Sequence, residues 1–214
     1  MNRSIAILGI HTDIGKTITS AVIAEALNAD YWKPVQAGNL DSSDSLLVQS
    51  LLSDGTNRVH EEAIKLSQPM SPHAAAEIDG VEIDYTKFKW PETNKLLLVE
   101  TAGGILSPMT DTATMADFTQ HYKLPAILVS KNYLGSINHT LLSIEVLKNR
   151  GIKILGLIIN GEPNTASEQY IQQYSKVPII ARIPFFENLD NSAIKAQAAI
   201  IRGSLLQNLK NAGY

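Results

Sequence analysis

Residues 9–17, with the sequence GIHTDIGKT, carry the residue types of a loop that binds phosphate. Backbone N–H groups and the positive end of a following helix can receive phosphate oxygens, while Lys16 reaches the β- and γ-phosphates and Thr17 ligates Mg²⁺. The usual spacing is G-x-x-x-x-G-K-[ST], but the position six before Lys16 is Ile10, and the nearest earlier glycine is Gly9. The loop is therefore one residue longer than usual, which indicates a variant branch of the nucleotide-binding proteins.

Two carboxylates stand where a magnesium site could use them. Glu100 ends the aliphatic run LLLVE, and an acidic residue at the end of a buried strand is what a phosphate-loop enzyme uses to hold Mg²⁺. Asp44 lies in the first turn of a helix that we expect Asp41 or Ser42 to cap. An aspartate there more often only compensates the helix dipole, so a magnesium ligand is one of two interpretations for Asp44.

Lys33 and Asn160 stand at the ends of two other apolar runs. Pro34 holds Lys33 in an extended conformation, so its ammonium could lie over a transferring phosphoryl group or a carboxylate. Taken alone, a surface lysine is more often solvated than catalytic. The Asn160 amide can pair with the N6 and N7 edge of adenine, but asparagine at a strand end is also an ordinary turn former. Neither residue is decisive by itself.

The elements that must position these residues are short aliphatic runs alternating with stretches of helical pattern. The runs are apolar throughout, as in strands buried on both faces, and cover residues 4–9, 31–35, 96–100, 125–130, 152–160 and 177–184. Helices are expected at residues 16–28, 42–53, 111–121, 137–150, 165–175 and 190–211. This alternation predicts an α/β fold with a doubly wound, mainly parallel sheet, in which ligands collect outside the carboxyl ends of the strands.

The long irregular stretch at residues 54–94 is the one part of the chain without this alternation. Such an insertion is usually functional or a lid. The pairs Gln68-Pro69 and Ser71-Pro72 hold their neighbours extended and predict a short helix that begins near His73.

The composition indicates one domain over residues 1–214 and gives no indication of a nucleic-acid or membrane partner. A chain of 214 residues that is 44% hydrophobic can bury the core of one α/β domain. A net charge of −3 without a block of Lys or Arg gives no footprint for nucleic acid or a membrane surface. The lack of cysteine excludes disulfides, thiolate metal sites and a Cys nucleophile. No apolar run approaches the roughly 18 residues of a membrane span, so we expect a cytoplasmic protein.

Taken together, several motifs resemble the dethiobiotin synthetase family, the ligases of the biotin pathway. In chain order they are GIHTDIGKT, WKPVQAG, SSDSL, SPHAAAE, VETAGG, YLGSINHTLL and LIIN. Their order and spacing are similar to those of the family over residues 3–190, which is nearly the whole chain. The resemblance implies a P-loop NTPase type of fold and an ATP-dependent cyclo-ligase. Its substrates would be 7,8-diaminopelargonate, CO₂ or bicarbonate, and ATP, with Mg²⁺ as cofactor.

The resemblance also implies roles for single residues. Lys33 is implied as the catalytic lysine, assisted by Lys16 on the phosphates and by Thr12 near a carbamate. The implied ligands of Mg²⁺ are Thr17, Asp44 and Glu100. The implied nucleotide-binding residues are Asp13, Ile14, Gly15, Lys16, Thr17, Ile18, Asp44, Glu100, Thr101, Ala102, Gly103, Asn160 and Pro184.

A homodimer is implied as well. In it, the helix start at Gly135, Ser136 and Asn138 reaches the carboxylate tail of a substrate bound to the other subunit, and Ala37 lies near the substrate. A helix N-terminus suits that carboxylate, because its free N–H groups and dipole favour an anion.

The chain departs from the family pattern at three places. Residues 10–12 read Ile-His-Thr where the family usually has Thr-Asp-Thr or similar. Ala37 replaces a Ser or Thr that often meets substrate, and Thr101 replaces a usual Gly. These departures concern fine contacts with substrate and nucleotide, and none removes the charged residues described above.

Three other kinds of protein are alternatives to this interpretation. A partition or positioning ATPase of the ParA and MinD type has a similar loop, but it carries a second lysine five residues before the main one, where this chain has His11. A cobyrinate-type amidotransferase needs a glutaminase domain with a Cys nucleophile, which this chain lacks. A regulatory nucleotide-binding module without catalysis remains open on the sequence alone.

Overall fold

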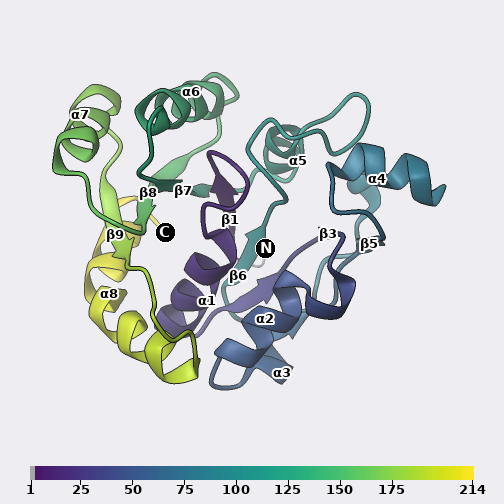
Figure 1. Cartoon of the computed structure of the whole chain (residues 1–214), viewed down its shortest axis with the longest axis horizontal. Coiled ribbons are helices and arrows are strands. Elements are labelled where there is room, and N and C mark those ends of the chain that lie inside the picture. The colour runs from purple at the N-terminus through teal and green to yellow at the C-terminus, as the bar shows by residue number, and fades with distance from the viewer. Residues whose placement is uncertain (1–2) are drawn as a thin grey trace.

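The central sheet has seven strands in the order β4-β2-β6-β1-β7-β8-β9, and every neighbouring pair runs parallel (Figure 1). The computed structural model describes residues 3–214. The strands of this sheet are β1 (Ser4–Gly9), β2 (Asp30–Trp32), β4 (Val59–His60), β6 (Leu97–Glu100), β7 (Ala126–Lys131), β8 (Ile154–Asn160) and β9 (Ile179–Ile183). The predicted α/β fold with a doubly wound, parallel sheet is confirmed.

Helices cover both faces of the sheet (Figure 1). One face carries α5 (Met115–His121), α6 (Ser136–Asn149) and α7 (Thr165–Ser175). The other carries α1 (Lys16–Leu27), α2 (Asp44–Leu51) and α8 (Asn191–Asn211). The chain reverses direction across the sheet at β1, which lies between β6 and β7, so the loop after β1 opens at a topological switch point.

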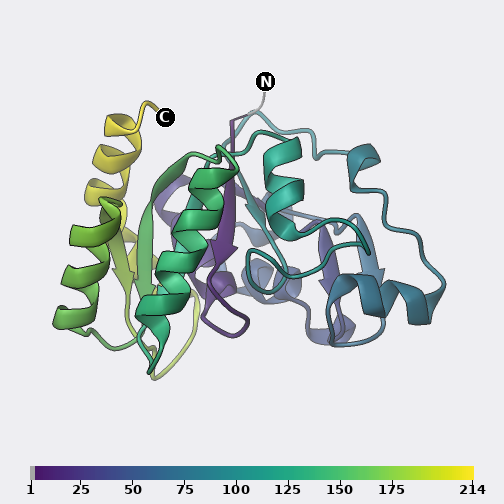
Figure 2. The same ribbon diagram turned by 90° about the horizontal axis from the view of Figure 1, so that it is seen from above.

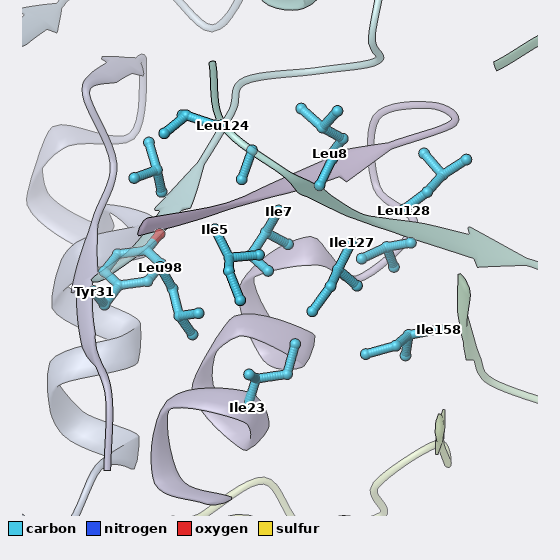
Figure 3. Close-up of a cluster of buried hydrophobic side chains, with 14 of the residues drawn as sticks. Ile5, Ile7, Leu8, Ile23, Tyr31, Leu98, Leu124, Ile127, Leu128 and Ile158 are labelled. Carbon is cyan, nitrogen blue, oxygen red and sulfur yellow. The ribbon is translucent and has the colours of Figure 1, made fainter. Parts of the chain in front are cut away.

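The core is built from strands whose side chains are buried on both faces. Ile5 and Ile7 of β1 point to one face of the sheet, where Ile23 of α1 packs against them beside Leu98 and Ile127, and Leu8 points to the opposite face (Figure 3). All six side chains are fully buried. Continuous burial explains why these strands read as unbroken apolar runs in the sequence.

The predicted strand at residues 31–35 is two strands in the structure. The chain leaves the main sheet at Trp32, and Pro34, which lacks an N–H, interrupts the ladder before β3 (Val35–Ala37) begins. β3 then pairs with β5 (Ile64–Leu66) in a separate two-stranded sheet. Lys33 therefore lies at the turn between the two sheets.

The stretch at residues 54–94 is less irregular than predicted. It contains α3 (Gly55–Arg58), β4, β5, α4 (Pro72–Asp79) and the 3₁₀ helix η2 (Tyr85–Lys87). The predicted short helix near His73 is α4, with Pro72 in its first turn. Together with β3, α4 and β5 form a lobe beside the main sheet (Figures 1 and 2).

The start of α2 differs from the prediction. The cap of α2 is Ser43, whose Oγ accepts a hydrogen bond from Leu46 N at 3.3 Å, so the predicted caps Asp41 and Ser42 are wrong. Those residues belong instead to the 3₁₀ helix η1 (Leu40–Ser42).

Within residues 3–214, no helix is both long and apolar enough to cross a bilayer.

Candidate active site

A pocket of about 630 Å³ opens at the carboxyl ends of β1 and β6, between the phosphate loop and the lobe formed by β3, β5 and α4. Twelve of the predicted site residues line it together: Thr12, Asp13, Gly15, Lys16, Thr17, Ile18, Lys33, Ala37, Asp44, Glu100, Ala102 and Gly103. The pocket is therefore the place where the predicted phosphate, metal and catalytic residues converge.

The phosphate loop is held in shape by Asn160 at the end of β8. Its Nδ2 donates to the carbonyl of Ile14 at 2.7 Å. Gly15 has φ of +85°, and a Cβ at this position would lie 1.7 Å from Asn160 Nδ2. Only glycine fits, because both the left-handed backbone and the approach of Asn160 exclude a side chain.

Lys16 begins α1 and lies almost buried at 7% exposure, with Nζ donating to the carbonyl of His11 at 3.3 Å. Burial lowers the pKa of Lys16, and the negative charge of Glu100 only partly opposes this effect. The Lys16 ammonium has few protein partners and is shielded from water. It would therefore attract an anion that enters the pocket more strongly than an exposed lysine would.

Lys33 forms an ion pair with Asp44, and its Nζ lies 3.6 Å from Glu100 Oε1. Burial works to lower the pKa of Lys33, but the charges of Glu100 and Asp44 outweigh it and raise the pKa above its ordinary value. Burial likewise works to raise the pKa of Asp44, and Lys33 outweighs it and lowers that pKa. Both groups therefore stay charged at neutral pH.

Glu100 is 1% exposed and accepts three hydroxyl hydrogen bonds. Thr17 Oγ1 lies 3.0 Å from Oε1, Ser20 Oγ lies 2.7 Å from Oε2, and Tyr31 OH lies 3.2 Å from Oε2. Burial and the charge of Glu100 raise the pKa of the Tyr31 phenol well above its ordinary value, so this hydroxyl stays a donor. The carboxylate is thus solvated by protein groups instead of water.

The oxygen atoms of this cluster fit a magnesium ion. Thr17 Oγ1 lies 2.6 Å from Asp44 Oδ1 and 3.0 Å from Glu100 Oε1, which brings a hydroxyl and two carboxylates together. Hard oxygen ligands of this kind are the ones that Mg²⁺ prefers, usually completed by water and substrate phosphate. In the described part of the chain, no group of three or more His, Cys, Asp or Glu side chains could hold a metal ion.

The remaining predicted residues lie outside this pocket. Ile14 and Thr101 are buried behind it, with Thr101 Oγ1 donating to Ile7 O at 3.4 Å. Pro184 follows β9, which pairs with β8 so that Asn160 lies opposite Ile183. Gly135 and Asn138 line a different pocket, of about 810 Å³, between the starts of α6 and α7, and Ser136 beside them is buried.

The start of α6 is braced by a buried carboxylate. Glu168 of α7 is 2% exposed and accepts hydrogen bonds from Asn132 Nδ2 at 2.8 Å and Asn164 N at 2.9 Å. It also pairs with Arg182 of β9. Asn132 lies in the loop before α6 and donates in addition to Glu162 O at 2.9 Å, so Glu168 ties together the loops that follow β7 and β8.

His11, where the chain leaves the family pattern, points away from the phosphate pocket. Its Nδ1 donates to Thr12 O at 2.8 Å, and its ring stacks near that of His139 with centroids 6.5 Å apart. His139 Nδ1 lies 2.7 Å from Tyr133 OH. Thr12 belongs both to the phosphate pocket and to the groove of about 380 Å³ that the two histidines line.

Several residues in or beside the pocket were not predicted from the sequence. Gln36 accepts from Asp44 N at 3.4 Å, and Ser107 Oγ accepts from Gly104 N at 2.8 Å. Ser20 could have been found, because it lies three residues after Thr17 on the same face of α1. Unpredicted lining from the lobe and α2 comprises Asn39, Leu47, Pro69, Met70, Ser71 and Pro72.

Comparison with known proteins finds one matching family model and several similar enzymes that share one name. A family model described as an AAA domain matches residues 3–193. The ATP-dependent dethiobiotin synthetase BioD of Christiangramia forsetii is 46% identical over 97% of this chain and 100% of that protein. The enzyme of the same name from Chlamydia pneumoniae is 44% identical over 92% of this chain and 88% of that protein.

The chain belongs to the ATP-dependent dethiobiotin synthetase family. The predicted family resemblance is confirmed. Among solved structures, the cell division ATPase MinD of Pyrococcus furiosus aligns with a TM-score of 0.57 over 99% of both chains, at 18% identity. A putative plasmid partition protein of Borrelia burgdorferi aligns with a TM-score of 0.55 at 10% identity. At these identities the structural neighbours support the P-loop NTPase type of fold for this chain, and the fold alone.

Proposed function

We propose that this protein closes the ureido ring of dethiobiotin from 7,8-diaminopelargonate, CO₂ and ATP, as an ATP-dependent cyclo-ligase of biotin biosynthesis. One amine of the substrate captures CO₂ as a carbamate, and a carbamate oxygen attacks the γ-phosphate to give a carbamic–phosphoric anhydride and ADP. The second amine then attacks the carbonyl carbon and expels phosphate. The observation that carries this proposal is the convergence of Lys16, Lys33, Thr17, Asp44 and Glu100 on one pocket in a chain of this family.

The protein's part in this reaction is positioning and charge neutralisation, as in other phosphoryl transfers. Lys16 and the loop around Gly15 bind the β- and γ-phosphates. Lys33, the proposed catalytic lysine, stabilises the charge that develops between carbamate and γ-phosphate, and Thr12 orients the carbamate. The ion pair between Lys33 and Asp44 supports the role of Lys33, because it holds the Lys33 ammonium in place before substrate arrives.

Nucleotide recognition extends from this pocket along the carboxyl edge of the sheet. Asp13, Ile14, Ile18, Thr101, Ala102 and Gly103 are proposed to surround the phosphates. Asn160 and Pro184 are proposed to recognise adenine at the ends of β8 and β9. The bond from Asn160 to the phosphate loop engages one of its donors and leaves Oδ1 for the base.

Thr17, Asp44 and Glu100 are the proposed ligands of Mg²⁺. A bound Mg²⁺ would supply charge neutralisation to the phosphate oxygens of ATP. The oxygen donors and their mutual distances support this assignment.

The proposed assembly is a homodimer in the cytoplasm, with one subunit completing the other's substrate site. Gly135, Ser136 and Asn138 would bind the carboxylate tail, while Ala37 contacts the diamine end. Exposed apolar side chains near this face support it: Leu134 is fully exposed and Leu142 is 56% exposed.

The proposed function is tested by following ADP release with ATP, Mg²⁺ and bicarbonate, with and without 7,8-diaminopelargonate. We expect release to depend on the diamine and to match the dethiobiotin formed, as measured by mass spectrometry. ADP release that is indifferent to the diamine would contradict the proposal and favour an ATPase switch.

A further inference from the structure

The two oxygens of the Glu100 carboxylate have different surroundings. Oε2 faces the protein interior and accepts from Ser20 Oγ at 2.7 Å and from Tyr31 OH at 3.2 Å. Oε1 faces the pocket, where it accepts from Thr17 Oγ1 at 3.0 Å and lies 3.6 Å from Lys33 Nζ. Oε2 is therefore held by buried hydroxyl groups. Oε1 lies beside Thr17 and Lys33, which are proposed to bind metal and to stabilise the transferring phosphate.

We propose that Tyr31 and Ser20 are positioning residues that hold Oε2 of Glu100 and so present Oε1 to the magnesium ion. This inference rests on the proposed role of Glu100 as a magnesium ligand. Partners that hydrogen-bond to a metal ligand fix its orientation, and their loss typically weakens metal binding. Neither Tyr31 in the core nor Ser20 in α1 has any other role in the proposed mechanism.

The position of Tyr31 is unusual for a residue that serves only packing. It is fully buried among aliphatic side chains such as Ile5 and Leu98, and its hydroxyl oxygen is visible at the edge of this cluster (Figure 3). Phenylalanine would fill the same space without burying a polar group, which carries a desolvation cost unless it is hydrogen-bonded. The bond to Glu100 satisfies that hydroxyl.

Three elements contribute to this arrangement. Ser20 projects from α1, Tyr31 lies on β2, and Glu100 ends β6, the strand that pairs with β2. The hydrogen bond from Ser20 fixes the position of α1 relative to β6, the strand that ends at Glu100. Because α1 also carries Thr17, the same bond fixes Thr17 relative to the Glu100 carboxylate. Without the two donors, the Glu100 carboxylate would be free to rotate, and Oε1 would no longer be held beside Thr17 Oγ1.

The test compares magnesium binding in Tyr31→Phe and Ser20→Ala with the wild type. Mg²⁺ is titrated against a fixed concentration of fluorescent ADP, and nucleotide affinity without Mg²⁺ and Tm are measured alongside. Each variant is expected to raise the Mg²⁺ midpoint by about tenfold, the lower end of the range for such partners, with unchanged magnesium-free affinity. Ser20→Ala serves as an independent variant should the change at Tyr31 prevent folding.

Tyr122→Phe is the matched control, because Tyr122 OH donates to Tyr85 O at 2.6 Å and neither residue lines the pocket. It removes one tyrosine hydrogen bond and should leave the Mg²⁺ midpoint unchanged. Midpoints for Tyr31→Phe and Ser20→Ala equal to that of the wild type would overturn the inference. Glu100→Gln separates the two levels: if it too leaves the midpoint unchanged, the proposed role of Glu100 itself fails.

Discussion

At the scale of single residues, the site is a balance between two buried ammonium groups and two carboxylates. Lys33 and Asp44 form an ion pair. Against the effect of burial, the charges of Glu100 and Asp44 raise the pKa of Lys33, and Lys33 lowers the pKa of Asp44. Lys16 has less compensation, and burial lowers its pKa. The unbalanced charge of Lys16 is the one that an incoming phosphate would neutralise.

Lys33→Ala is predicted to lose at least about 2.7–4 kcal/mol of transition-state stabilisation, the usual effect of removing one preorganised charge contact. Steady-state kinetics of dethiobiotin formation measures this loss as a fall in kcat. The matched control is Lys65→Ala, because Lys65 pairs with Glu61 on an exposed surface outside the pocket. Normal turnover by Lys33→Ala would show that the assigned role is wrong.

At the scale of elements, the long strands and helices could be predicted, because each carries a continuous apolar run or a periodic pattern over many residues. The short strands could not: β4 has 2 residues and β3 and β5 have 3 each, too few for any periodicity. Charged site residues at strand ends were also predictable from their position after apolar runs. Tyr31 was not, because its contact with Glu100 depends on the pairing of β2 with β6, which local sequence does not encode.

Glu168 acts at this scale, since it joins α7 to the loop before α6. Glu168→Gln replaces an acceptor oxygen with a donor amide and loses part of the bonding to Asn132, Asn164 and Arg182. We predict a raised KM for the diamine, with kcat and the KM for ATP nearly unchanged, because the α6 start is proposed to bind the carboxylate tail. Kinetics with each substrate varied in turn measures this difference.

Asp117→Asn provides the control for that experiment. Asp117 accepts from Thr114 N at 2.7 Å and pairs with Arg150, so it also caps a helix and binds an arginine. Its loss should lower Tm in a similar way but leave the KM of both substrates unchanged. If Glu168→Gln behaves like Asp117→Asn, Glu168 only stabilises the fold.

At the scale of the whole molecule, acid should unfold the protein through its paired carboxylates. Despite burial, the pKa values of Glu25, Asp44, Asp117 and Glu168 lie below their ordinary values of 3.8 for Asp and 4.5 for Glu, because hydrogen bonds and nearby positive groups outweigh desolvation. Such groups contribute stability above their unfolded pKa, and this contribution is lost as pH falls through the folded pKa. The free energy of unfolding, measured by urea denaturation, should therefore fall steadily below about pH 4.5.

Asp44→Asn tests which part of that slope comes from the site. The variant should unfold less steeply with falling pH than the wild type, because one carboxylate with a lowered pKa is gone. An unchanged slope would show that Asp44 contributes nothing to acid unfolding.

The proposed dimer leads to a prediction about the assembly. In this dimer, the substrate site of one subunit would be completed by α6 of the other. Lys33→Ala damages the site in its own subunit, whereas Asn138→Ala would damage the site that lies in the partner. A heterodimer of the two variants carries both defects at one site and leaves the other site intact. Random mixing of equal amounts makes half of the dimers heterodimeric, so activity should recover to about a quarter of the wild-type value. Each variant alone sets the baseline, and recovery no greater than the average of the two baselines would show that each subunit binds the substrate tail with its own α6.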